Sequence, residues 1–273
     1  LTVRAAKLYM DGAMGSRGAW LLEPYADRPT GSDGQPWTGL AVADPAFIEA
    51  VARHGLEKGY QVCTHAIGDR ANREVLGAYA RAISGRYAGT DENEASRNHR
   101  FRIEHAQLVS LDDVHRFGQW AIIASMQPTH CTSDMRWVEA RVGAKRAEGA
   151  YAWVSLLSAG AVVAGGSDFP VESHNPFLGI YAAVTRQTPE GQPEGGWRPT
   201  QKMLRMDGVY AFTRSAAYAA FEEKDRGTLE AGKLADFVVI DRDIEKCEPK
   251  EILGTRVLRT VIGGETVYEA GEE

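Results

Sequence analysis

Short apolar runs that end in polar residues recur along the first two thirds of the chain. Each run has the length of a buried strand, and side chains capable of chemistry follow it at once. Continuous apolar runs of this length are typical of parallel strands that are covered on both faces. The predicted strands cover residues 3–10, 60–64, 101–103, 121–126 and 161–164.

Helical patterns lie between these runs. Asp44-Pro45 supplies an N-cap and a first-turn proline for one helix, and Gly59 ends it. Ser110 with Asp113 resembles a capping box at the start of another. Strands that alternate with helices predict an α/β fold with a parallel sheet. The predicted helices run from Pro45, from Asp69 through Ile83, from Ser110 through Phe117, and over residues 151–159 and 204–221.

The last part of the chain has a different pattern. Short β runs cover residues 234–240, 257–262 and 265–268, and Gly263-Gly264 between the last two is typical of a two-residue hairpin turn. No crossover helix separates these runs, so they predict a separate small sheet. We therefore expect one domain over residues 1–225 and a second over residues 226–273.

Four of the predicted strand ends carry Lys7, His65, His105 and Asp168, which are 58, 40 and 63 residues apart. An eight-unit barrel of about 250 residues has roughly 30 residues per β/α unit. The first gap then holds one unit and a long loop over residues 12–39, the second holds one unit, and the third holds two. This spacing places the four residues on strands four, five, six and eight, at the rim where barrel active sites lie.

These residue types suit a divalent metal. Two imidazoles and a carboxylate are common zinc ligands. A bound metal lowers the pKa of water toward ~7, and a nearby carboxylate can take the proton. Each residue also has a structural explanation, because a histidine after a strand is more often a hydrogen-bonding residue, Lys7 can be solvated, and Asp168 can belong to a turn. The residues alone leave both interpretations open.

Composition narrows the class of protein. A net charge of −6 gives no reason to expect nucleic acid or an anionic membrane as a partner. Residues 1–273 contain no apolar run of membrane-spanning length and no signal-peptide pattern, and we expect the natural N-terminus to lie ahead of Leu1. Cys63, Cys131 and Cys247 are far apart and odd in number, so they predict no disulfide framework. We expect a cytoplasmic protein with a small-molecule substrate, and a homo-oligomer is a candidate assembly.

Longer motifs resemble a known family. Together they are similar to the amidohydrolase superfamily, and most closely to its amidohydrolase-3 (YtcJ-like) branch, over essentially the whole chain. The matching stretches are KLYMDGAMGSRGAWLLEPY (7–25), THAIGDRAN (64–72), RIEHAQL (102–108), SMQPTH (125–130), GGSDFPVES (165–173) and GTLEAGKLADFVVIDRD (227–243).

The resemblance implies a fold and a site. Residues 1–225 would form strands four to eight of a TIM-like (β/α)8 barrel, and residues 226–273 the C-terminal strands of a small β-sandwich. Lys7 would be carbamylated and bridge two metals, His65 and His105 would be ligands, and Asp168 would bind metal and carry the proton. The reaction implied is hydrolysis of a C–N bond of an amide-type substrate, with one or two Zn²⁺ ions.

Two further residues are candidates for substrate binding. His130 follows the presumed seventh strand, where it either faces the pocket or packs locally. Arg17 lies in the long loop after Lys7, where it either contacts substrate or lies at the surface. The sequence does not choose between these alternatives.

The chain departs from the family pattern in one respect. The family carries a His-x-His pair at the end of the first barrel strand, and none of the seven histidines here forms such a pair. We interpret the chain as a fragment without the first three strands, which would leave open sheet edges. Two alternatives are a non-catalytic paralogue and a barrel glycosidase using Glu104 and Asp168. The histidines beside these carboxylates argue against the glycosidase.

Overall fold

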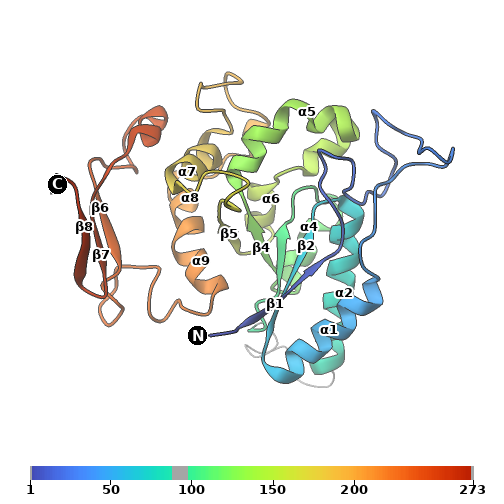
Figure 1. Cartoon of the computed structure of the whole chain (residues 1–273), viewed down its shortest axis with the longest axis horizontal. Helices are drawn as coiled ribbons and strands as arrows, with labels where there is room; N and C mark the ends of the chain where they lie inside the picture. Colours follow the sequence, from blue (N-terminus) through green and yellow to red (C-terminus); the bar gives the residue numbers. More distant parts are fainter. Residues whose placement is uncertain (1, 88–97, 272–273) are drawn as a thin grey trace. The chain divides into compact units, whose positions relative to one another are not determined.

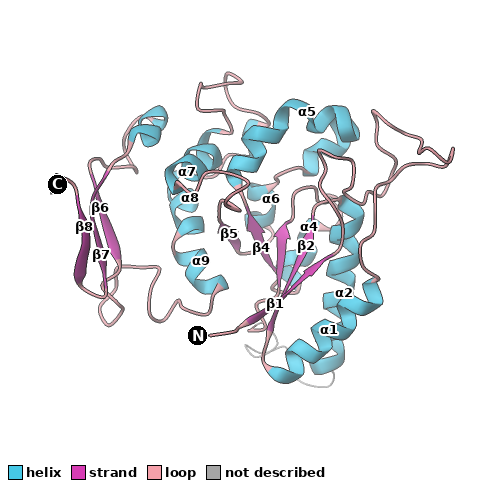
Figure 2. Ribbon diagram, in the orientation of Figure 1, coloured by secondary structure: helices cyan, strands magenta, loops and turns pink. Residues whose placement is uncertain are grey.

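The computed structural model describes residues 2–87 and 98–271 and has an α/β fold. Its larger sheet has five strands in chain order, and the pairs from β1 to β4 are parallel, as Figure 2 shows. The parallel sheet predicted from the apolar runs is therefore confirmed. The strands are β1 (Ala5–Tyr9), β2 (Gln61–Ala66), β3 (Arg102–His105), β4 (Ile123–Met126) and β5 (Val163–Gly165).

The first helix begins and ends where the sequence signals predict, and the second begins at Asp69 as predicted but extends beyond Ile83 to Tyr87. The Asp44 side chain accepts a hydrogen bond from the Ala46 N–H at 2.8 Å, and Gly59 ends the helix in the left-handed conformation at φ 74°. These are α1 (Pro45–Lys58) and α2 (Asp69–Tyr87), which lie side by side in Figure 1. The smaller helices α4 (Val114–Gln119) and α6 (Trp153–Ser158) follow later in the chain.

The chain divides into two compact units, each with its own buried residues. One comprises residues 1–126 and 134–163, with Val62, Leu76 and Phe101 fully buried. The other comprises residues 127–133 and 164–273. It contains α7 (Pro176–Thr185), α8 (Arg205–Phe212) and α9 (Arg214–Ala219), and its apolar cluster is built on Phe177, Ile180, Tyr181 and Ile252.

The C-terminal segment forms the predicted small sheet. Strands β6 (Phe237–Ile240), β7 (Val257–Ile262) and β8 (Glu265–Glu269) pair antiparallel. Gly263 and Gly264 both have positive φ, at 59° and 86°, which a two-residue turn of this hand requires. All three strands lie within residues 226–273, although the boundary at 225/226 itself stays a prediction.

Two local predictions are wrong. The predicted helix over residues 204–221 is two helices, because Thr213 between them has non-helical backbone angles and its hydroxyl donates to the Val209 carbonyl at 2.9 Å. The capping box at Ser110 does not form, and α4 begins at Val114. The Asp113 carboxylate is instead bound by two arginines, Arg73 at 2.7 Å and Arg116 at 3.0 Å.

The sequence analysis also missed two helices. Helix α5 (Pro128–Arg146) begins directly after β4, and its apolar residues form no stripe on one face. Helix α7 is capped by Asn175, whose side chain accepts from the Phe177 N–H at 3.0 Å, ahead of a first-turn proline. The Asn-Pro pair was a usable signal for α7, whereas α5 offered only the proline at its first position, Pro128, without a capping residue before it.

The three cysteines Cys63, Cys131 and Cys247 form no disulfide with one another. Cys63 and Cys131 are buried, and Cys247 is partly buried. Burial raises the pKa of the Cys63 thiol to about 11, which fits a core residue. Within residues 2–87 and 98–271, every helix is too short or too polar to cross a membrane.

Candidate metal centre

The parallel register brings two rows of side chains to one face of the sheet. Tyr9 pairs with His65, and His65 pairs with Glu104, so these three residues share a face. Lys7 on β1 belongs to the neighbouring row of the same face, because it lies two residues before Tyr9. Lys7 and His65, which the spacing predicted to lie near each other, are therefore on the same face of the sheet.

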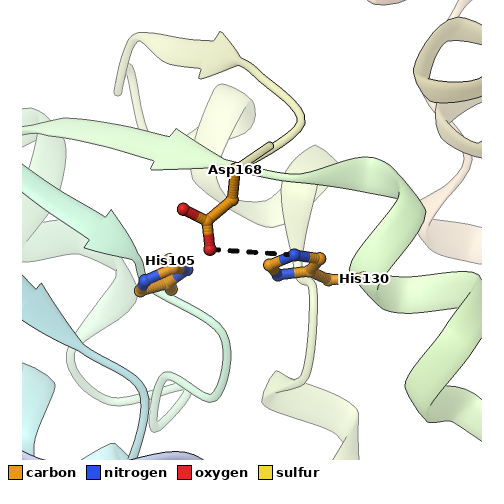
Figure 3. Close-up of side chains that lie close together, drawn as sticks. All are labelled: His105, His130 and Asp168. Atoms are coloured by element: carbon orange, nitrogen blue, oxygen red, sulfur yellow. Dashed lines mark ion pairs between the residues drawn. The ribbon is translucent and has the colours of Figure 1, made fainter. Parts of the chain in front are cut away.

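His105, His130 and Asp168 offer one ligand atom each, and these atoms all lie within 4.8 Å of one another (Figure 3). His105 is the last residue of β3, His130 lies in the first turn of α5, and Asp168 follows β5 by three residues. His130 Nε2 lies 4.0 Å from Asp168 Oδ2. Two imidazoles and a carboxylate are a donor set that suits zinc and related divalent ions.

His65 lies beside this group. Its ring centroid is 4.5 Å from that of His105, and the two rings meet edge to face. Its Nε2 is buried and forms no hydrogen bond with the described residues. Burial, and then the neighbouring His105 and Lys7, lower the pKa of His65 to about 3, so the ring is neutral at pH 7. A buried neutral imidazole with an unused nitrogen fits the ligand role.

The structure also places Lys7 and Arg17, the two other predicted site residues. The exposed Lys7 has its Nζ 5.3 Å from the centre of the Tyr9 ring. Arg17 binds Asp27 through Nε at 3.0 Å and through a second nitrogen at 2.9 Å, and Arg141 binds the same carboxylate. The carbamylation of Lys7 and the contact of Arg17 with substrate stay predictions.

Glu104 is engaged with a neighbour on its own strand. Arg102 Nε donates to Glu104 Oε1 at 2.8 Å, and both side chains are largely covered. A glycosidase acid must give up its proton to the substrate and so needs a carboxyl group that can be neutral. The Glu104 carboxylate is instead occupied by Arg102 of its own strand, which argues against the glycosidase alternative.

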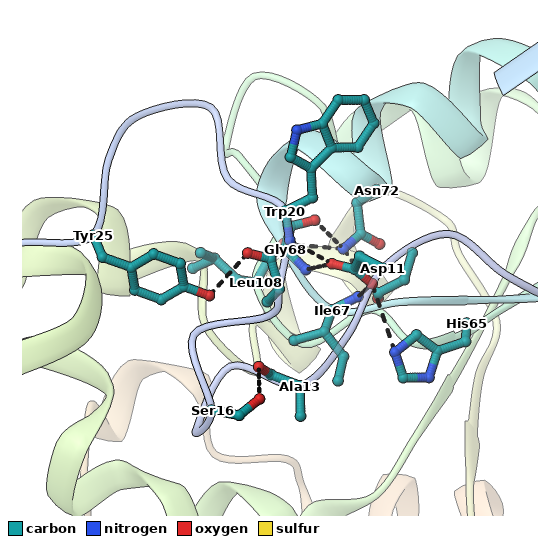
Figure 4. A network of polar contacts seen from close by, with 12 residues as sticks. Asp11, Ala13, Ser16, Trp20, Tyr25, His65, Ile67, Gly68, Asn72 and Leu108 are labelled. Atoms are coloured by element: carbon teal, nitrogen blue, oxygen red, sulfur yellow. Dashed lines mark hydrogen bonds and ion pairs between the residues drawn. The ribbon is translucent and has the colours of Figure 1, made fainter. Parts of the chain in front are cut away.

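The sequence analysis missed the role of Asp11, which follows β1 directly and is only 2% exposed. Its carboxylate accepts hydrogen bonds from the backbone N–H groups of Trp20, Ile67 and Gly68, at 2.8, 2.9 and 2.8 Å (Figure 4). Burial raises the pKa of Asp11 to about 7, although these three donors act in the opposite direction. A carboxylate directly after a strand was the only signal available in the sequence.

Two members of the candidate site have strained backbone. His105 has φ 76° and Asp168 has φ 56°, in the left-handed region that costs a residue with a Cβ about 1–2 kcal/mol. Such conformations persist where the surrounding structure holds them, and they gather at functional sites. Their occurrence at two residues of one donor set supports a functional site.

The strain at His105 can be measured with two substitutions. We expect His105→Gly to be more stable than His105→Ala by ~1 kcal/mol, because glycine alone is unstrained at this φ. His115, exposed in α4, is the matched control, and there glycine should be the less stable by ~1 kcal/mol. Urea unfolding of the four variants measures both differences. If the alanine variant is the more stable of the two at position 105, the backbone of His105 is unstrained.

Comparison with known proteins identifies the family of the chain. The model of the amidohydrolase family Amidohydro_3 matches residues 1–268, and the chain belongs to this family. It is 36% identical over 98% of its length to the protein LONG AFTER FAR-RED 3 of Arabidopsis thaliana, covering 43% of that protein. It is 34% identical over 97% of its length to the putative amidohydrolase YtcJ of Bacillus subtilis (strain 168), covering 47% of it. The chain therefore spans about half the length of these curated relatives.

Two more distant similarities concern chemistry and fold. An N-substituted formamide deformylase of Arthrobacter pascens is 33% identical over 42% of this chain, which covers 21% of that enzyme. An uncharacterized metal-dependent hydrolase from Pyrococcus furiosus matches with a TM-score of 0.73 and 31% identity, over 89% of this chain and 45% of its own. The predicted family is therefore confirmed, together with an α/β fold that metal-dependent hydrolases share.

Proposed function

We propose that this protein is a metal-dependent hydrolase that cleaves a C–N bond in a small amide-type molecule. The observation that carries the proposal is the group of His105, His130 and Asp168, whose ligand atoms lie within 4.8 Å of one another. Membership of the amidohydrolase family supports hydrolysis. The similarity to a formamide deformylase supports a C–N bond as the target.

The residues present fit a bound metal, and each has a definite task. His65, His105, His130 and Asp168 would hold the ion, with Lys7 as a further ligand if it is carbamylated. A divalent ion held there lowers the pKa of water and polarises a carbonyl group. Asp168 has a side chain that is 42% exposed, so its carboxylate can receive the proton of the attacking water and deliver it to the leaving nitrogen.

Several finer features belong to the same proposal. We infer zinc, as one or two ions, because imidazole and carboxylate are common zinc ligands in proteins. A (β/α)8 barrel would place all these strand ends at one rim, and the five-stranded parallel sheet is consistent with part of such a barrel. A cytoplasmic location and assembly into a homo-oligomer are further proposals.

Metal content tests the proposal directly. We expect the protein at its natural full length to contain about one to two zinc ions per chain by elemental analysis, as catalytic zinc sites do. Removing the ion with a chelator should abolish hydrolysis of a panel of N-formyl and N-acetyl amines, and added zinc should restore it. A protein that binds no divalent metal, and whose activity withstands chelation, would leave the non-catalytic paralogue as the better explanation.

A further inference from the structure

Asp11 holds two separate loops together at the end of the parallel sheet. It follows β1 at the start of the long loop over residues 12–39, and two of its three hydrogen bonds come from the turn after β2. The third comes from Trp20 within the long loop itself. Backbone donors satisfy this buried carboxylate, and they belong to segments that are far apart in the sequence.

The same carboxylate lies against a residue of the candidate metal site. Asp11 Oδ1 is 3.6 Å from His65 Nε2, and the dashed line in Figure 4 marks this approach. His65 lies just before the turn that Asp11 fixes, since the donors Ile67 and Gly68 come two and three residues later. Its ring is also bordered by Tyr9, whose centroid is 5.3 Å away.

Other contacts fix the turn on which His65 depends. The Asn72 side chain donates to the carbonyl groups of Ala66, Gly68 and Leu108. The Trp20 carbonyl accepts from the first N–H groups of α2, at Arg70 and Ala71. The loop is thus attached to α2 independently of Asp11, so loss of Asp11 need not release the whole loop.

We propose that Asp11 is a positioning residue, which fixes the His65 imidazole for metal binding by locking the turn after β2 to the loop after β1. This inference rests on the proposed function, because it takes His65 as a ligand. Partners that orient metal ligands typically contribute 10–100-fold to metal affinity. The effect of Asp11 should therefore appear in affinity, beyond any effect on folding.

Asp69 offers a matched control. Its carboxylate also anchors the long loop, because it accepts from the Leu22 N–H at 2.8 Å, and it also binds the Arg70 N–H at 3.0 Å. Both of these partners lie outside the candidate metal site. Truncating Asp69 thus removes a comparable anchor of the same loop and leaves His65 untouched.

The experiment compares Asp11→Ala with Asp69→Ala in the natural full-length protein. We expect the zinc affinity, measured by competition with a chelator, to fall 10–100-fold in Asp11→Ala and less than about three-fold in Asp69→Ala. In metal-free protein labelled with ¹⁵N-histidine, the His65 ring signals, assigned with His65→Gln, should broaden in Asp11→Ala only. If Asp11→Ala does not fold, Asp11→Asn, which keeps one acceptor oxygen, replaces it.

Each of the other possible results contradicts one specific part of the proposal. Equal losses of affinity in the two alanine variants would make Asp11 a loop anchor with no specific effect on His65. Unchanged His65 ring signals in Asp11→Ala would do the same. Absence of zinc binding by the unsubstituted protein would contradict the proposed function, and the metal-free ring signals would then decide the role of Asp11 by themselves.

Discussion

Asp168→Asn should lower the turnover of amide substrates about 10³-fold or more, within the range that loss of a general acid–base group gives. Asparagine has the shape of aspartate but accepts no proton at neutral pH. It also tolerates the left-handed backbone at φ 56°, so the substitution should leave the fold intact. The measurement is kcat at saturating zinc, with thermal unfolding to confirm that the variant is folded.

A second aspartate separates this effect from a general loss of charge. Asp243 is exposed and pairs with Lys246, whose side chain is 80% exposed, so Asp243→Asn should change neither activity nor stability measurably. Activity of Asp168→Asn within a few-fold of the unsubstituted protein would remove Asp168 from proton transfer. The group of His105, His130 and Asp168 would then have to bind metal for another purpose.

Gly68→Ala should destabilise the protein by about 3 kcal/mol, at the upper end of the usual cost of overpacking. A Cβ at this position would lie 2.0 Å from the Trp20 carbonyl oxygen and 2.7 Å from the Trp20 nitrogen. Both atoms belong to backbone, so no rotation of a side chain relieves the overlap. The loop must shift, and this breaks the hydrogen bonds of Trp20 with Asp11 and with the start of α2.

Gly15→Ala is the matched control in the same loop. A Cβ there would meet only the Trp137 ring at 3.5 Å, which is an ordinary contact, so stability should change little. Urea unfolding of both variants measures the difference. If Gly68→Ala is as stable as Gly15→Ala, the loop is not packed against α2 as closely as the structure places it.

The alternation of strands and helices was determined locally. The predicted strands over residues 60–64 and 101–103 overlap β2 and β3, and Asp44-Pro45 and Gly59 bound α1 as expected. Apolar runs and capping residues act over a few positions, so the sequence states them directly. The glycine pair at 263–264 specified its hairpin for the same reason.

Helices without a local signal could not be predicted. Helix α5 has no apolar stripe along one face, so hydrophobic periodicity did not indicate it. The predicted single helix over residues 204–221 divides at Thr213, whose backbone angles are not helical. The local helical pattern of that segment did not reveal this break.

The candidate site likewise combines features that the sequence predicted with features that depend on the tertiary structure. The sequence by itself determined the family and the candidate ligands His65, His105 and Asp168, because each follows a predicted strand. The tertiary structure alone brought His130 into the group with His105 and Asp168, and linked Asp11 to Ile67 and Gly68, which lie 56 and 57 residues further along the chain. A hydrogen bond over that separation depends on the register of β1 against β2, and a register is a property of the folded sheet that no short stretch of sequence contains.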